Sequence, residues 1–282
     1  MARVEWSGGA SSSAMAEVLE AGDVAFFPAL AFAIAVPERQ LFSPQLVASS
    51  KNVSFDPRTG RLGGTSLEGG DATRLRDLVS RFSGVASALV KEVLPAYGDR
   101  IETGRTSFRP VEIAGRASSW RKDDTRLHLD SFPATPVHGK RILRVFSNVN
   151  PEGRPRVWRV GEDFESVARR FVPFLRLPRP WTSPLLRLLR VTKSPRSPYD
   201  ALMLQLHDLM KADTGYQADA PQTTVDFPAG STWMAFTDSV SHAAMAGQYQ
   251  LEQTFLVPVP AMLDQSRSPL RVLERSMGRA LV

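Results

Sequence analysis

The sequence contains no cysteine and only four histidines among its 282 residues. The absence of cysteine excludes disulfide bonds, thiolate-bound zinc, iron–sulfur clusters and cysteine nucleophiles. Any metal ion must therefore be bound by histidine, aspartate or glutamate side chains. The few histidines are the first candidates for metal ligands.

The sequence also lacks a long apolar run. Its longest near-candidate, residues 29–36, is much shorter than the roughly twenty apolar residues of a membrane-spanning helix. The N-terminal residues 1–6 show no basic region followed by an apolar one, which argues against a secretory signal. We expect a cytoplasmic protein.

Length and composition favour one domain. With 43% hydrophobic and 23% charged residues, the chain can bury a sizeable core. Residues 1–105 are expected to form a mostly helical N-terminal layer, because apolar residues follow three-and-four spacing between Asp71 and Pro95. Residues 23–28 are expected to form a short strand, and residues 52–64 a loop.

From residue 106 the hydrophobic period changes to two, the period of a strand with one buried face. Short strand-like runs separated by turns indicate a sandwich or barrel over residues 106–260. They are residues 107–113, 126–131, 141–148, 156–160, 223–227, 232–237, 241–245 and 250–257. A helical insertion is expected at about 163–211. Ser268 and Pro269 are typical of the start of a C-terminal helix within residues 261–282.

Two histidines and one aspartate form a pattern typical of a metal site. Alternate side chains of a strand share a face, so His128 and Asp130 can bind one ion while Leu129 packs on the other side. His242 lies in a later strand-like run, which closure of a jelly roll can bring beside the earlier one. Two imidazoles and one carboxylate can hold a divalent iron and leave three adjacent positions open. His128, Asp130 and His242 therefore predict an oxygen-using iron enzyme.

Each histidine also has a simpler interpretation. His128 could be a half-buried strand residue bonded to Asp130, and His242 a core or capping residue. For His138, in a predicted loop, and His207, on a predicted amphipathic helix, an ordinary surface position is favoured.

An open iron site needs an electron donor. A keto acid such as 2-oxoglutarate can chelate the metal at two positions while its far carboxylate binds an arginine. Arg144 lies in the predicted strand that follows the metal motif, and Asn148 shares its face. We expect these two residues to contribute to the co-substrate site; the alternative for Arg144 is an exposed basic residue.

The basic character of the chain is concentrated in one segment. The net charge is +6, yet residues 169–196 carry eight basic residues and no acidic one, so the remainder is slightly acidic. Aromatic residues and leucines alternate with the arginines, which is typical of an element that lies on an anionic membrane surface. A helical cover on the sheet is the alternative. Nucleic-acid binding is disfavoured, because no nucleic-acid module is recognisable.

The sequence resembles the Kdo hydroxylases in three places. These are the tripeptide His128-Leu129-Asp130, Arg144, and the stretch from residues 227–233 through His242 to residues 253–255. The Kdo hydroxylases are iron(II)- and 2-oxoglutarate-dependent dioxygenases of Gram-negative bacteria. The resemblance implies a double-stranded β-helix (a cupin-like jelly roll, mainly β with α additions), with His128, Asp130 and His242 as ligands of Fe(II), and 2-oxoglutarate and O2 as co-substrates. It also implies hydroxylation of the Kdo sugar of Kdo-bearing lipid A at carbon 3, giving Ko. Together with the basic segment, this predicts a protein peripherally associated with the inner membrane at its cytoplasmic face.

One departure from the wider dioxygenase superfamily concerns the 2-oxoglutarate site. Many members carry an arginine shortly after the distal histidine, whereas this chain has Glu252, Gln253 and Thr254 there. Arg144 is then the expected partner of the far carboxylate, supplemented by a neutral hydrogen bond from Gln253.

Two other functions are compatible with the sequence. One is the same iron chemistry on another anionic small molecule or on a protein side chain. The other is a catalytically silent, membrane-bound lipid-binding module that kept the fold. Consumption of 2-oxoglutarate that depends on iron(II) separates the enzymes from the silent module.

Overall fold

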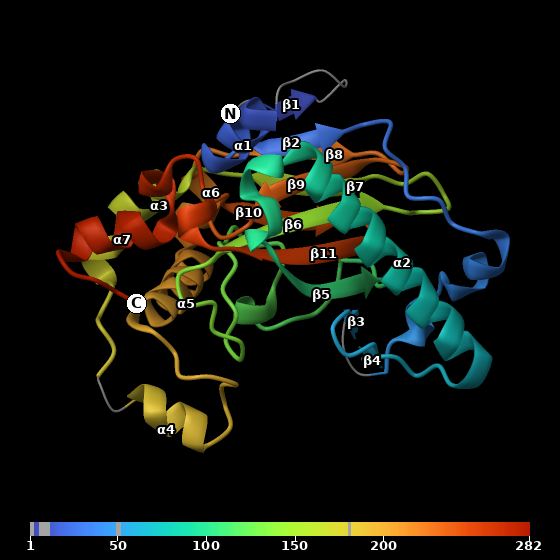
Figure 1. The fold of residues 1–282 in the computed structure, drawn as a ribbon, viewed down its shortest axis with the longest axis horizontal. Helices are drawn as coiled ribbons and strands as arrows, with labels where there is room; N and C mark the ends of the chain where they lie inside the picture. The colour runs from blue at the N-terminus through green and yellow to red at the C-terminus, as the bar shows by residue number, and fades with distance from the viewer. Residues whose placement is uncertain (1–2, 6–11, 49–51, 180–181) are drawn as a thin grey trace.

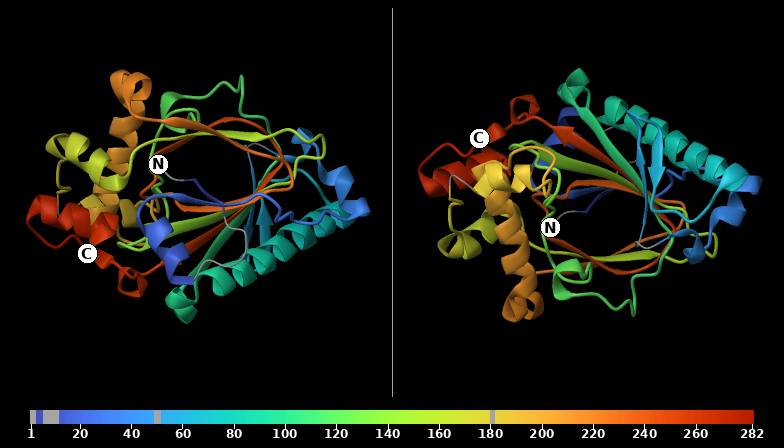
Figure 2. Two further views of the ribbon diagram at one scale, coloured as in Figure 1. Left: turned by 90° about the horizontal axis from the view of Figure 1, so that it is seen from above. Right: turned by 90° about the horizontal axis from the view of Figure 1, so that it is seen from below.

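Two β-sheets face each other in the computed structural model, which describes residues 3–5, 12–48, 52–179 and 182–282 (Figures 1 and 2). The large sheet has the order β1 (Arg3–Glu5), β2 (Val24–Phe27), β9 (Thr232–Phe236), β6 (Arg141–Asn148), β11 (Gln250–Val257), β5 (Glu102–Arg109), β3 (Val53–Asp56) and β4 (Arg61–Gly63). The small sheet has the order β10 (His242–Ala246), β7 (Arg156–Val160) and β8 (Thr223–Phe227).

The connections between the sheets are those of a jelly roll. Successive core segments cross repeatedly from one sheet to the other, so that β11 lies between β5 and β6 in the large sheet. The segment around His128 joins the open edge of the small sheet through an antiparallel bridge to His242. The predicted double-stranded β-helix is therefore confirmed.

Most predicted strands lie where the period of two places them. The bounds of β6, β7, β8 and β11 agree with the prediction, and those of β9 and β10 differ by one residue. In contrast, β5 begins earlier than predicted and ends at Arg109, because Pro110 has no N–H to continue the pairing. Residues 126–131 form only the isolated bridge at His128 instead of a regular strand.

The N-terminal part supplies both helices and strands. α1 (Ser12–Glu20) and α2 (Gly69–Val93) are helical, and α2 packs its apolar face on the outer face of the large sheet (Figure 2). The prediction of a loop over residues 52–64 was wrong, because β3 and β4 form a hairpin there. Val53 and Phe55 alternate with less buried Ser54 and Asp56, which is the pattern of an amphipathic strand.

The insertion between β7 and β8 is helical, as predicted. It contains α3 (Phe164–Phe171), α4 (Thr182–Leu188), α5 (Pro198–Ala212) and α6 (Thr214–Asp219), and α4 projects away from the body of the protein (Figure 1). α3 and α5 share a second apolar core with α7 (Pro269–Met277), whose N-terminus is capped by Ser268 as expected. Short 3-10 helices lie at Val36–Leu41, Pro44–Leu46, Pro95–Arg100, Trp120–Lys122, Val172–Phe174, Val259–Ala261 and Gln265–Arg267. No helix in the described ranges is both long enough and apolar enough to cross a membrane.

A buried ion pair fixes the turn that leads from β9 to His242. Nε of Arg141 donates to Oδ2 of Asp238 at 2.8 Å, and the side chains are 0% and 1% exposed. The same guanidinium donates to Oγ of Ser239 at 2.7 Å and lies 4.0 Å from the ring centre of Phe236. The turn is thereby anchored to β6, immediately before the strand that carries His242.

Removing one member of the Arg141–Asp238 pair should destabilise the protein. We expect Asp238→Ala to lower the free energy of unfolding by about 3–5 kcal/mol, because it leaves the Arg141 charge buried without a counterion. Urea denaturation followed by circular dichroism measures the loss. The exposed Asp226→Ala is the control, with an expected change within about 0.5 kcal/mol. Equal stability of the two variants would contradict the role given to the pair.

Candidate metal centre

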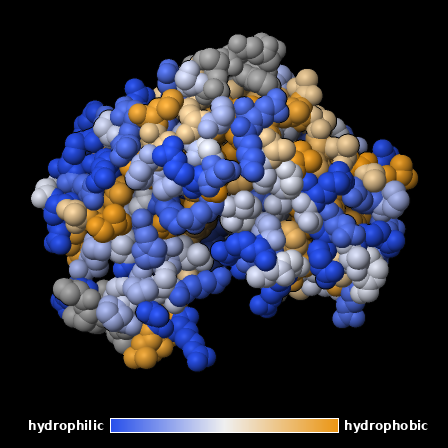
Figure 3. Space-filling model, viewed as in Figure 1, coloured by the Kyte–Doolittle hydropathy of each residue, from blue (hydrophilic) through white to orange (hydrophobic). Residues whose placement is uncertain are grey.

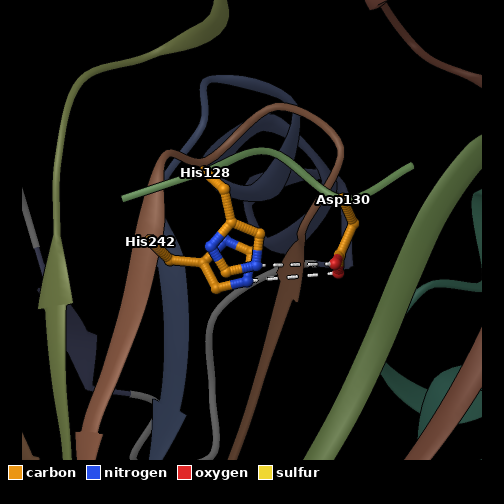
Figure 4. Close-up of side chains that lie close together, drawn as sticks. All are labelled: His128, Asp130 and His242. Atoms are coloured by element: carbon orange, nitrogen blue, oxygen red, sulfur yellow. Dashed lines mark ion pairs between the residues drawn. The ribbon is translucent and has the colours of Figure 1, made fainter. Parts of the chain in front are cut away.

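His128, Asp130 and His242 converge between the two sheets (Figure 4). One ligand atom from each residue lies within 4.8 Å of the other two. Nε2 of His128 is 3.9 Å from Oδ1 of Asp130, and Nε2 of His242 is 4.0 Å from Oδ2 of the same carboxylate. The structure therefore brings together all three predicted metal ligands.

Backbone hydrogen bonds place these side chains. The N–H of His128 donates to the carbonyl of His242, and the N–H of His242 donates to the carbonyl of His128, both at 3.0 Å. The N–H of Asp130 donates to the carbonyl of Thr237 at 2.8 Å, which joins the motif to the end of β9. Leu129 is fully buried in the apolar core of the insertion. The alternation expected from the sequence thus holds, although the segment is not a regular strand.

Both imidazoles present Nε2 to the centre. Nδ1 of His128 lies 2.7 Å from the carbonyl of Arg126, and Nδ1 of His242 lies 2.9 Å from the carbonyl of Val240. A carbonyl only accepts, so each Nδ1 must carry the proton and each Nε2 keeps its lone pair. Trp158 stacks on the ring of His242 with its centroid 5.1 Å away. Both rings are therefore held in the orientation that a metal requires.

The electrostatics also suit a divalent cation. Burial lowers the pKa of His128 and of His242, so both imidazoles are neutral at neutral pH. Burial would raise the pKa of Asp130, but the charge of Arg144 is the largest of the effects that outweigh burial and lower it. Oδ2 of Asp130 is buried and has no hydrogen-bond partner among the described residues. Two neutral nitrogens and one ionised oxygen fit an iron(II) site with an open face.

Arg144 extends this centre into the interior. Its Nη1 lies 3.3 Å from Oδ2 of Asp130 and 3.0 Å from Oε1 of Glu252. Nε of Arg109 in turn donates to Oε2 of Glu252 at 2.8 Å. Nε of Arg144 is buried without a hydrogen-bond partner among the described residues. The arginine is therefore largely buried beside the centre, not exposed on a strand.

Asn148 and Gln253 do not reach the centre. Nδ2 of Asn148 donates to the carbonyls of Arg154 and Phe227, and its place four residues along β6 puts it about 13 Å from Arg144. Gln253 pairs with Val145, so it faces α2 on the other side of the large sheet. Its Oε1 accepts from Thr106 at 2.6 Å. Both amides hold the backbone and strands together, and the geometry gives neither a place in the co-substrate site.

One of the four histidines was placed wrongly from the sequence. His207 was expected at the surface, but its ring meets the edge of His128 at a centroid distance of 5.4 Å, and its side chain is only 18% exposed. His138 agrees with the expectation, since its side chain is 45% exposed. The position of His207 on an amphipathic helix of the insertion was the only signal in the sequence. That position does not show which face of the helix contacts the segment of His128.

Removal of one ligand should abolish metal binding and turnover together. We expect His128→Ala to lower the affinity for Fe(II) or Co(II) by at least about 100-fold, because two protein ligands remain of three. Calorimetry with Co(II) and iron-dependent turnover of 2-oxoglutarate measure the two effects. His138→Ala, a surface histidine variant, should retain both. Undiminished Co(II) affinity in His128→Ala would rule out the assigned ligand set.

Comparison with known proteins agrees with this geometry. The family model described as 3-deoxy-D-manno-oct-2-ulosonic acid (Kdo) hydroxylase matches residues 6–280. The crystal structure of the Kdo hydroxylase KdoO, a non-heme Fe(II) alphaketoglutarate-dependent dioxygenase, in complex with cobalt(II) is 44% identical, with a TM-score of 0.96 over 99% of this chain and 97% of that chain.

The KdoO complex with alphaketoglutarate and Fe(III) is also 44% identical, with a TM-score of 0.96, and covers 100% of this chain and 98% of that chain. The complex with succinate and Fe(III) has a TM-score of 0.94 at the same 44% identity, over 99% and 97% of the two chains. A search of curated protein sequences found no match. The chain therefore belongs to the Kdo hydroxylase family of non-heme Fe(II)- and 2-oxoglutarate-dependent dioxygenases.

Proposed function

We propose that this enzyme hydroxylates the Kdo sugar of Kdo-bearing lipid A at carbon 3, giving Ko. In the balanced reaction, O2 supplies one oxygen atom to the sugar C–H bond and one to 2-oxoglutarate, which loses carbon dioxide and becomes succinate. The observation that carries the proposal is the cluster of two buried histidines and one half-buried aspartate in a chain of the Kdo hydroxylase family. Iron(II), when bound by His128, Asp130 and His242, supplies the activation of oxygen.

The protein's own task is to bind the co-substrate and exclude water. Arg144 contacts the metal ligand Asp130, and its fork geometry suits a carboxylate. In the structure it is shared by Asp130 and Glu252, while Arg109 also neutralises Glu252. Glu252 can remain paired with Arg109 when Arg144 binds the far carboxylate of 2-oxoglutarate. This arrangement supports Arg144 as the counterpart of the arginine that is absent after His242.

The projecting part of the helical insertion supports attachment to an anionic membrane. Leu188 and Leu189 are 78% and 62% exposed, and Phe174 is 63% exposed. Arg187 and Arg190 are exposed beside these leucines, and Figure 3 shows apolar and hydrophilic residues side by side at this end of the molecule. Arginines that bind lipid phosphates and leucines that enter the headgroup region are the usual composition of an interfacial element.

This surface fits the proposed substrate, because Kdo-bearing lipid A is an anionic lipid held in a membrane. We therefore place the enzyme at the cytoplasmic face of the inner membrane, bound peripherally through the insertion around α4. Each basic residue near an anionic leaflet contributes about 1 kcal/mol, so the exposed arginines suffice for reversible attachment.

The co-substrate role of Arg144 can be measured directly. Arg144→Ala should raise the KM for 2-oxoglutarate at least about tenfold, the loss of roughly 1.5–3 kcal/mol expected for a charged hydrogen bond. Succinate formation at varied 2-oxoglutarate and saturating iron measures it. Arg105→Ala, an exposed arginine of β5, serves as the control. An unchanged KM in Arg144→Ala would shift the role to Arg109 or Arg156.

The membrane surface can be tested by charge reversal. Arg187→Glu combined with Arg190→Glu should release the protein from vesicles that contain anionic phospholipid, because attraction to the leaflet becomes repulsion. Co-sedimentation at physiological ionic strength measures the bound fraction. Arg74→Glu combined with Arg76→Glu makes the same change of net charge on α2 and should leave binding intact. Equal binding by both double variants would remove the insertion from the membrane contact.

A further inference from the structure

One face of α5 is turned toward the metal centre. His207 and Lys211 are four residues apart on this helix, so they lie on the same face. The ring of His207 meets the edge of His128, at a centroid distance of 5.4 Å. Lys211 is therefore placed one turn further along the face that contacts a metal ligand. Nδ1 of His207 lies 3.0 Å from Asp208, which leaves its Nε2 for other contacts.

Lys211 is a buried cation without a carboxylate partner. The residue is 2% exposed, and among the described residues no carboxylate oxygen lies within 4.0 Å of its Nζ. Its Nζ donates to the carbonyl of Arg121 at 3.1 Å. Burial lowers the pKa of Lys211, which is the expected sign for an ammonium that has lost water without gaining a counterion. A buried lysine without a charged partner is rare, and perturbed groups of this kind cluster at functional sites.

The carboxylates around Lys211 are already bound to other cations. Four aspartates act on its charge, and each forms an ion pair with an arginine. The pairs are Asp123 with Arg126 at 3.5 Å, Asp124 with Arg116 at 2.7 Å, Asp130 with Arg144 at 3.3 Å, and Asp208 with Arg121 at 3.0 Å. The positive charge of Lys211 is thus the one in this group that no protein carboxylate neutralises at contact distance among the described residues. An anionic ligand would complete the set.

The proposed substrate carries a carboxylate close to its reacting carbon. In a 3-deoxy-oct-2-ulosonic acid the carboxyl carbon is C1, and it is bonded to C2, which is bonded to the C3 methylene. A C3 that is presented to the iron therefore brings the C1 carboxylate within two bonds of the reacting carbon. Arg144, which contacts Asp130, serves the co-substrate in the proposed function. We propose that Lys211 binds the carboxylate of the Kdo unit and so selects an acidic sugar; this inference rests on the proposed function.

Removing the charge of Lys211 should weaken binding of the Kdo substrate without weakening binding of 2-oxoglutarate or the metal. Lys211→Met should raise the KM for Kdo-bearing lipid A by on the order of tenfold or more, whereas Lys211→Arg, which keeps the charge, should stay within about threefold of wild type. Lys140→Met, which removes a lysine paired with the exposed Glu102, is the matched control. The affinities for 2-oxoglutarate and Co(II), both measured by calorimetry, and the melting temperature should be unchanged in Lys211→Met, since a purely structural lysine would move them.

A second measurement identifies the group that Lys211 meets. The methyl ester of the Kdo carboxyl should bind wild type about as weakly as the acid binds Lys211→Met, with little further loss in the variant, because the two changes remove the same interaction. Independent losses, an unaltered KM for the acid, or a parallel loss of 2-oxoglutarate affinity would each overturn the inference. If wild type leaves Kdo unmodified, the proposed function fails instead. Calorimetry of free Kdo acid and ester with wild type and Lys211→Met then decides the role of Lys211 separately.

Discussion

Two reciprocal backbone hydrogen bonds between His128 and His242, both at 3.0 Å, are the contact on which the metal centre depends. They join a segment near the start of the jelly roll to a strand near its end. Because residues opposite each other in an antiparallel bridge project to the same side, both imidazoles reach one point between the sheets. Asp130 follows through its own backbone bond to Thr237. The three ligands therefore come from two segments that only closure of the fold brings together.

The interior around this contact is divided between charges and aromatic rings. On one side Asp130, Arg144, Glu252 and Arg109 form a continuous series of ion pairs, in which each charge has an opposite neighbour. On the other side Trp158 stacks on His242, and Trp233 stacks on Phe227 with ring centroids 4.0 Å apart. The rings hold the histidine in place, while the arginine stays near the metal ligands without being fixed to one partner. A rigid metal centre and an adaptable cation are the two properties that co-substrate binding requires.

The sequence was most informative where a local pattern decides the structure. Alternation predicted β6, β7, β8 and β11, and the tripeptide at His128 predicted two ligands on one side. It was least informative where contacts between distant segments determine the position of a residue. The hairpin of β3 and β4 was predicted to be a loop because of Pro57 and the glycines that follow it. Gln253 was placed in the co-substrate site, although the strand alternation turns it toward α2. His207 and Lys211 were not recognised, because helical spacing gives a shared face but not the neighbour that this face meets.

The central claim is that this centre inserts an oxygen atom from O2 into the Kdo sugar. The most direct test supplies 18O2 to the iron-loaded enzyme with 2-oxoglutarate and Kdo-bearing lipid A, followed by mass spectrometry of both products. The account predicts one labelled oxygen on the Kdo unit, at carbon 3, for each labelled succinate formed. Labelled succinate beside an unmodified Kdo unit would contradict the substrate, and the absence of succinate from an enzyme that binds iron would contradict the catalytic function itself.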